Sequence, residues 1–204
     1  MAEVLVYVDH VDGAVRKPTL ELLTLARRIG EPVALALGNG AADTAAVLAE
    51  HGAIKVLTAE APEFADYLVV PKVDALQAAY EAISPAAVLV PSSAEGKEIA
   101  ARLAVRIQSG LITDAVDLEA AGEGVVASQS AFAASYTTKS RVTTGTPVIT
   151  VKPNSAAVEA APAAGAVEAL AVSFSAQATG TKVTGRTPRE STGRPELTEA
   201  AIVV

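Results

Sequence analysis

The first half of the chain contains four short apolar runs. Residues 4–8, 33–37, 54–57 and 88–90 are each nearly continuous in apolar, largely β-branched side chains and have the length of a strand. Continuous rather than alternating hydrophobicity is typical of strands that are buried on both faces of a parallel sheet. We therefore expect these four runs to be adjacent parallel strands.

Segments with helical spacing of apolar residues lie between these runs. One begins at Pro18 and ends before Gly30, and others cover residues 44–50, 72–83 and the stretch that follows Ser92. Strand and helix alternate four times, which predicts an α/β fold, a doubly wound and mostly parallel sheet with right-handed crossovers.

The stretch from Val88 to Asp114 is predicted to contain a strand, a tight turn, a helix and a further apolar segment. Ser92 stands three residues before Glu95, which is the capping-box spacing for the start of a helix. The apolar stripe of that helix leads to Gly110, expected as the left-handed residue beyond its end. A further apolar segment, residues 111–113, then ends at Asp114.

The turn at residues 91–97 is a candidate for ligand binding, because open α/β sheets bind ligands at the carboxyl ends of their strands. It offers Ser92, Ser93, Gly96 and Lys97 as phosphate-binding candidates. The simpler interpretation, which we favour, is that its polar residues only cap the helix, since neither Gly-x-Gly-x-x-Gly nor Gly-Lys-Ser/Thr is present.

The second half of the chain shows strands without helices. Residues 125–130, 132–138, 147–151 and 167–174 have strand composition and are joined by turns. We expect them to add an antiparallel or mixed edge to the parallel sheet, with residues 154–166 as a surface loop.

These patterns suggest a division of the chain into parts. Residues 1–174 are expected to form an N-terminal α/β domain and residues 175–195, polar and without periodicity, a linker. Residues 196–204 become apolar and β-branched where the sequence stops. We interpret them as the first strand of a missing C-terminal domain.

Composition narrows the classes of function. The net charge of −7 without a Lys/Arg cluster argues against nucleic acid, and the absence of Cys excludes disulfides, thiolate catalysis and iron–sulfur ligation by this chain. No apolar stretch reaches membrane-spanning length and no secretory signal is visible, so a cytoplasmic protein is expected.

Few side chains suggest chemistry, and we expect no catalytic and no metal-binding residue. His10 lies between Asp9 and Asp12, where a metal site is conceivable but turn formation is favoured. His51, in the last turn of a helix, is expected to be structural.

Two arginines lie one turn apart on the central helix. Arg102 and Arg106 could together bind a carboxylate or phosphate, or could form a solvated flank in which Glu98 pairs with Arg102. We favour the solvated flank for Arg106 and leave Arg102 open.

Several blocks of the sequence carry a family resemblance, in order and over essentially the whole chain. The chain resembles the large (alpha) subunit of electron transfer flavoproteins of actinobacterial type in VLVYVDHVDGAVRKPTLELLTLARRIG, ALGNG, HGAIKVL, VLVPSSAEGKEIAARLAVRIQSGLITDAVDL, TPVITVKP and RPELTEAAIVV. It departs from many relatives at residues 129–139, which read QSAFAASYTTK where a basic residue and a pair of glycines are usual.

The resemblance implies a scaffold rather than an enzyme. It implies an N-terminal domain related to adenine-nucleotide-binding folds that pairs with a beta subunit, while FAD is bound mainly by the absent C-terminal domain. In the complete heterodimer, electrons would pass from flavin dehydrogenases, as in fatty acid β-oxidation, to a quinone oxidoreductase of the respiratory chain. The alternative is a stand-alone nucleotide-binding module similar to universal stress proteins, which would hold a phosphate at residues 91–97.

Overall fold

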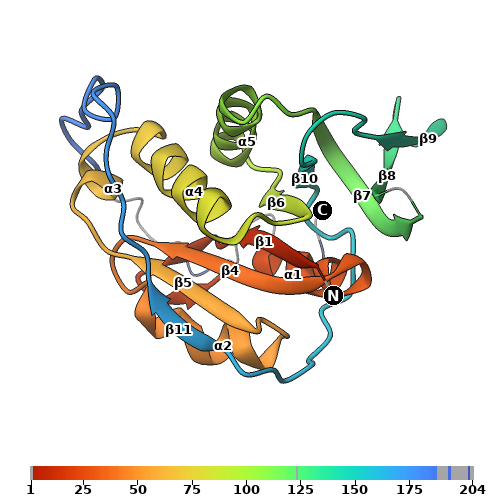
Figure 1. Cartoon of the computed structure of the whole chain (residues 1–204), viewed down its shortest axis with the longest axis horizontal. Helices are drawn as coiled ribbons and strands as arrows, with labels where there is room; N and C mark the ends of the chain where they lie inside the picture. The colour runs from red at the N-terminus through yellow and green to blue at the C-terminus, as the bar shows by residue number, and fades with distance from the viewer. Residues whose placement is uncertain (1, 123, 188–192, 194–201, 203–204) are drawn as a thin grey trace.

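Seventeen short elements make up the part of the chain that the computed structural model describes, residues 2–122, 124–187, 193 and 202 (Figure 1). Among these described residues, no helix is both long and apolar enough to cross a bilayer. In chain order the elements are β1 (Glu3–Tyr7), β2 (His10–Val11), β3 (Ala14–Val15), α1 (Lys17–Ile29), β4 (Glu31–Leu37), η1 (Ala42–Thr44), α2 (Ala45–Glu50), β5 (Lys55–Ala59), α3 (Glu63–Asp66), α4 (Val70–Ile83), β6 (Ala87–Pro91), α5 (Ala94–Arg106), β7 (Leu111–Ala121), β8 (Gly124–Ala131), β9 (Tyr136–Arg141), β10 (Val148–Val151) and β11 (Ala166–Ala169).

The main sheet has the strand order β11-β5-β4-β1-β6-β10-β7-β8-β9. β1 lies at its centre and pairs in parallel with β4 on one side and β6 on the other. β5 continues the parallel pairing beyond β4. The expectation that the four apolar runs form adjacent parallel strands is confirmed, as is the doubly wound α/β fold.

Two apolar layers explain why these strands are continuously hydrophobic. Val4 and Val6 face the layer shared with α1 and α2, whereas Leu5 and Tyr7 face the layer shared with α4 and α5. Because successive side chains of a strand point to opposite faces, a central strand covered on both sides needs an apolar residue at every position. Each fully buried leucine or valine contributes about 1.5–3 kcal/mol relative to an exposed one.

Two later strands lie elsewhere than expected. β10 is inserted between β6 and β7 and pairs in parallel with both, and β11 pairs in parallel with β5 at the opposite edge. All four residues of β10 are buried, like those of the other central strands. Among the described strands, β8 and β9 form the antiparallel edge, which confirms the expectation for the strands near residues 125–138. The expectation that β10 and β11 also belong to that edge is wrong.

β7 is longer than the apolar segment suggested. It continues past Asp114, which has a left-handed φ of 57°, and its register shifts between Ala115 and Asp117. The expected strand at residues 132–138 is also displaced, because residues 132–134 have positive φ and turn the chain into β9. Such a shift reflects turn geometry, which composition does not reveal.

Residues 152–165 cross from β10 to β11 over α1 and α2. Glu21 of α1 is buried and its Oε2 accepts a 2.7 Å hydrogen bond from the backbone N–H of Asn154. Lys17 lies 3.3 Å from the other carboxylate oxygen and also donates to the Asn154 side chain at 2.6 Å. The loop is therefore held to α1 by a buried carboxylate.

The chain after β11 returns along α3 and α4. Leu170 donates to the carbonyl of Thr58, and Val183 donates to the carbonyl of Asp66. Residues 175–187, which fall in the segment expected to be a linker, therefore contact the α/β domain. Residues 188–192 and 194–195, and the expected strand at 196–204 apart from Ile202, lie outside the described residues.

An ion pair with a buried carboxylate joins α4, α5 and this returning segment. Arg106 donates to Asp74 Oδ1 at 2.6 Å, and the backbone N–H of Ser175 donates to Asp74 Oδ2 at 2.7 Å. The Asp74 side chain is only 4% exposed, whereas that of Arg106 is 29% exposed. The solvated flank expected for Arg106 is wrong, because α4 packs against that side of α5. Arg102, whose role was left open, pairs with Glu98 at 2.8 Å.

We predict that Asp74→Ala lowers the free energy of unfolding by about 2 kcal/mol. The substitution leaves a partly buried guanidinium and the Ser175 N–H without their acceptor, which costs more than the pair itself contributes. Urea unfolding followed by circular dichroism measures the loss. The control is Glu98→Gln, which breaks the exposed Glu98–Arg102 pair on α5, the helix that carries Arg106. This variant should lose less than about 0.5 kcal/mol of unfolding free energy. Equal losses in the two variants would contradict the prediction.

Candidate functional site

The edge of the sheet where ligands usually bind in this type of fold lies at the carboxyl ends of the neighbouring strands β1 and β6. From β1 the chain proceeds through β4 and β5 to one side, and β6 begins the other side, so the crevice outside their carboxyl ends is a topological switch point. A cleft of about 340 Å³ opens there, lined among others by Tyr7, Arg16, Lys72 and Ser93. A second cleft of about 620 Å³ adjoins it beside Phe64.

The turn at residues 91–97 begins α5 with a cap different from the one expected. Ser93, not Ser92, is the N-cap, and its Oγ accepts a 2.9 Å hydrogen bond from the backbone N–H of Gly96. Glu95 turns outward and pairs with Lys72 of α4. The Ser92–Glu95 capping box is therefore wrong by one residue, because the hydroxyl of Ser92 has a better acceptor elsewhere.

Gly96 is required by packing rather than by a ligand. A Cβ at this position would lie 2.0 Å from the carbonyl oxygen of Pro91, although the residue has an ordinary helical φ. The close approach of α5 to the end of β6 therefore explains this glycine without a ligand.

Ser92 and Lys97 both converge on Asp114 of β7. The Ser92 hydroxyl donates to Asp114 Oδ1 at 2.6 Å and the Lys97 ammonium donates to Oδ2 at 2.9 Å. Thr150 of β10 completes the group, accepting from the Asp114 N–H at 3.1 Å and donating to Ser92 at 3.2 Å. The four side chains tie the carboxyl ends of β6 and β10 to the first half of β7, and we call them the Asp114 network.

The Asp114 network keeps its carboxylate charged. Burial alone would raise the pKa of Asp114, but the hydrogen bonds from Ser92 and Lys97 and the positive charge of Lys97 outweigh it and hold the pKa below its ordinary value. A lowered pKa means that the ionised form is the one that the fold stabilises.

The four phosphate-binding candidates are therefore all engaged within the protein. Ser93 caps α5, Gly96 packs on the backbone, and Ser92 and Lys97 neutralise a carboxylate that an incoming phosphate would have to displace. The turn itself contains no aromatic residue that could stack on a flavin. These residues do not fit the pyrophosphate or the ring of FAD.

Tyr7 is the buried polar residue of the switch-point cleft. Burial, and then the negative charges of Glu95 and Asp9, raise the pKa of its phenol, so the hydroxyl stays protonated at physiological pH. Its ring belongs to the apolar layer under α4 and α5. The cleft therefore combines a neutral phenol with two carboxylates, Asp9 and Glu95, and two cations, Arg16 and Lys72.

His10 opens β2 of a short hairpin, where it pairs with Val15, and the turn itself lies at Asp12 and Gly13. The Gly13 N–H donates to His10 Nδ1 at 3.3 Å, and Nε2 donates to the Leu37 carbonyl at 3.0 Å. The side chain thereby joins the β2–β3 hairpin to the end of β4. Both flanking carboxylates have other partners, since Asp12 accepts from Asn39 at 2.8 Å and Asp9 lies 3.9 Å from Arg16.

The other candidates are structural as well. His51 ends α2 and bonds through Nδ1 to the Val47 carbonyl at 2.8 Å. Within the described ranges, no three His, Asp or Glu side chains are grouped so as to hold a metal ion. Sequence reasoning missed Asp114 and Thr150 as members of a site; the available signal was that each is a polar residue directly after an apolar strand-like run, residues 111–113 and 147–149.

Comparison with known proteins gives a consistent result. Residues 4–176 match a family model described as electron transfer flavoprotein domain. The chain is 44% identical over 207 residues to the electron transfer flavoprotein subunit alpha of Mycobacterium leprae, which covers 100% of this chain and 64% of that protein. It is 46% identical over 180 residues to the subunit of the same name from Mycobacterium tuberculosis, with 87% and 55% covered.

A relative with another name shares part of the chain. The lactate dehydrogenase (NAD(+),ferredoxin) subunit LctC of Acetobacterium woodii is 34% identical over 119 residues, covering 56% of this chain and 28% of that protein. The chain thus spans less than two thirds of the length of the mycobacterial relatives that it matches.

We predict that the stabilising effect of Asp114 depends on pH. Because its folded pKa is lower than the ordinary 3.8, the contribution is fully present above that value and is lost as pH falls through the folded pKa. Asp114→Asn should therefore cost stability at pH 6, by less than about 1 kcal/mol since both charged groups are partly exposed, and progressively less toward pH 2. Asn tolerates the left-handed φ, so the backbone is not strained.

Chemical denaturation of the two proteins across this range measures the effect. Lys97→Met in the Asp114→Asn background is the control and should change stability less than Lys97→Met alone, because the two side chains act together. A difference between the two proteins that is constant with pH would contradict the prediction.

Proposed function

The chain belongs to the electron transfer flavoprotein domain family, and from this premise we propose that it is the N-terminal scaffold and subunit-pairing domain of an alpha subunit. Its partner in this proposal is the beta subunit. The complete heterodimer would carry electrons in the cytoplasm, from flavin dehydrogenases to a quinone oxidoreductase, through FAD bound mainly outside this chain. The domain would hold and orient partners rather than catalyse a reaction.

The hydrogen bonds of the Asp114 network favour this proposal over a nucleotide-binding module. Ser92 and Lys97, the two groups of residues 91–97 best suited to a phosphate, bind Asp114 instead. A module that uses this turn for a nucleotide would leave these groups free or pair them with the ligand. The similarity to alpha subunits, which extends over the whole chain, points in the same direction.

Pairing with a beta subunit is the first prediction of the proposal. Co-expression of this chain with the beta subunit from the same source should give one shared peak in size-exclusion chromatography, because the proposal places the interface within the domain described above. The beta subunit is also co-expressed with the Asp74→Ala variant, which shows how much of any loss of the shared peak comes from lower stability of the domain alone. Separate elution of the two wild-type chains would contradict pairing through this domain.

Absence of flavin from the purified chain is the second prediction. The turn at residues 91–97 offers no cradle for a pyrophosphate, so the chain purified alone should be colourless. Absorption spectroscopy after gel filtration tests this. A stoichiometric band at the visible flavin maximum would contradict the prediction and would make Ser92, Ser93 and Lys97 the first residues to substitute.

A further inference from the structure

One polar side chain of the switch-point cleft is buried without a hydrogen bond. Tyr7 is only 8% exposed, lines the cleft of about 340 Å³ and makes no side-chain hydrogen bond within the described part of the chain. Its phenol is protonated at physiological pH and can donate. Buried hydroxyl groups in proteins nearly always have a partner, so this one indicates an acceptor that the domain itself does not supply.

The first turn of α5 lines the same cleft. The Gly96 N–H is capped by Ser93, whereas the N–H groups of Ala94 and Glu95 make no hydrogen bond among the described residues. The start of this thirteen-residue helix therefore presents two donors and the positive end of its dipole to the cleft that contains the Tyr7 phenol. A carboxylate, which only accepts hydrogen bonds, suits these three donors.

The charged side chains of the cleft balance one another. Lys72 pairs with Glu95, and Arg16 lies 3.9 Å from Asp9. A ligand that carried negative charge alone would add that charge beside two carboxylates, and a phosphate dianion would add most. A ligand with one negative and one positive group leaves the cleft neutral.

Asp9 is available to the positive group of such a ligand. Its carboxylate meets Arg16 only at 3.9 Å, which is beyond hydrogen-bond distance. Tyr7 and Asp9 are two positions apart at the end of β1, and both line the cleft. A carboxylate held by Tyr7 and an ammonium group held by Asp9 would therefore lie close together, as they do in a free amino acid.

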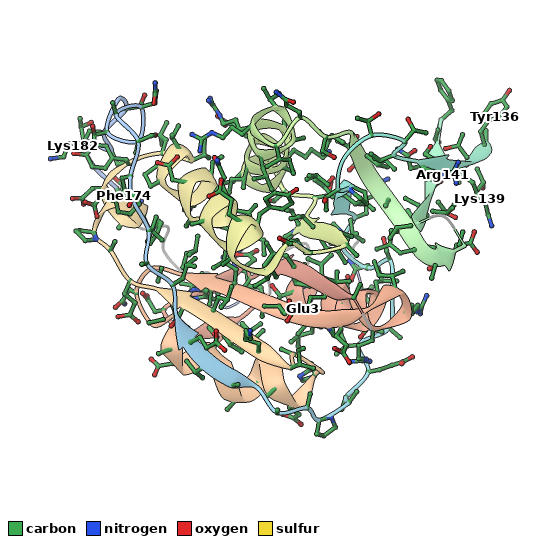
Figure 2. All side chains as sticks on the ribbon, in the orientation of Figure 1. Glu3, Tyr136, Lys139, Arg141, Phe174 and Lys182 are labelled. Carbon is green, nitrogen blue, oxygen red and sulfur yellow. The ribbon has the colours of Figure 1, made fainter. Side chains whose placement is uncertain are left out.

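The adjoining cleft of about 620 Å³ supplies apolar surface. Leu37 lines both clefts, and Phe64 and Ala61 line the larger one beyond it. Figure 2 shows Phe174 near α3, which carries Phe64, and the two rings meet edge to face with centroids 5.5 Å apart. The Phe64 ring is thereby fixed as one wall.

We propose that the switch-point cleft binds a free α-amino acid with an apolar side chain. The carboxylate of the ligand accepts from the Tyr7 hydroxyl and from the first N–H groups of α5, and its ammonium group donates to Asp9. Its side chain lies along Leu37 toward Phe64. The two clefts have the size and the mixture of apolar walls and few polar groups that small ligands use. This site is independent of the subunit pairing proposed above.

Calorimetry on the 204-residue chain tests the ligand class, with L-leucine as the probe. Two analogues keep its branched carbon chain: 4-methylpentanoate lacks the ammonium group and 3-methylbutylamine lacks the carboxylate. We expect saturable binding of L-leucine and a Kd at least about tenfold higher for each analogue, because each leaves charged groups of the cleft without their partner.

Tyr7→Phe tests the site itself. The substitution keeps the ring in the apolar layer and removes a hydroxyl that has no partner in the described domain, so the fold should be unaffected, as urea unfolding can check. We expect the Kd for L-leucine to rise at least about tenfold, since the lost hydrogen bond is made to a charged group. The matched control is Tyr80→Phe, whose hydroxyl lies 3.3 Å from that of Thr146 and outside the cleft. It should change the Kd less than about twofold.

Asp9→Asn tests the contact with the ammonium group. We expect it to weaken binding of L-leucine about fivefold and to change binding of 4-methylpentanoate less than about twofold, because only L-leucine carries the group that Asp9 accepts from. Equal effects on both ligands would show that Asp9 does not hold the ammonium group and would overturn the arrangement proposed.

The remaining outcomes also decide the matter. Absence of L-leucine binding overturns the proposal, and so does binding that Tyr7→Phe leaves unchanged. AMP and inorganic phosphate are titrated in the same way. If either binds more tightly than L-leucine, the cleft is an anion site and the proposal is overturned.

Discussion

Burial of the central strands on both faces is the constraint on which the rest of the structure depends. β1, β4 and β6 can remove all of their apolar side chains from water only if helices cover both sides of the sheet. Because these strands run parallel, their carboxyl ends lie on one edge of the sheet. The polar residues that follow β1, β4 and β6 are gathered at that edge for this reason, whether or not a ligand binds there.

At this edge the protein uses its own carboxylate where a nucleotide-binding relative of the fold would place an anion. Asp114 accepts from Ser92 and Lys97 and, through Thr150, joins β6, β7 and β10, which come from distant parts of the sequence. The network therefore stabilises the sheet beside the switch-point cleft.

The antiparallel extension formed by β8, β9 and the end of β7 is held differently from the parallel sheet. Leu118, Val125 and Ala127 anchor its base in the apolar layer shared with α1, whereas every residue of β9 except Ser140 is exposed. The conformation of its outer part therefore depends on the hairpin and on cross-strand pairs such as Lys139–Glu119.

Local periodicity in the sequence was enough to determine the four parallel strands, the helices between them and the boundaries of α1, to within one residue of Pro18 and Gly30, because each depends on neighbours a few residues away. It also determined the four turn residues as the candidate site, but not their roles. Only the tertiary structure decided that β10 inserts between β6 and β7, that Ser92 turns to Asp114, and that Arg106 is paired with Asp74. These contacts join residues 22 to 60 positions apart, and the chain segments that meet there are chosen by packing of the whole sheet, about which a local pattern carries no information.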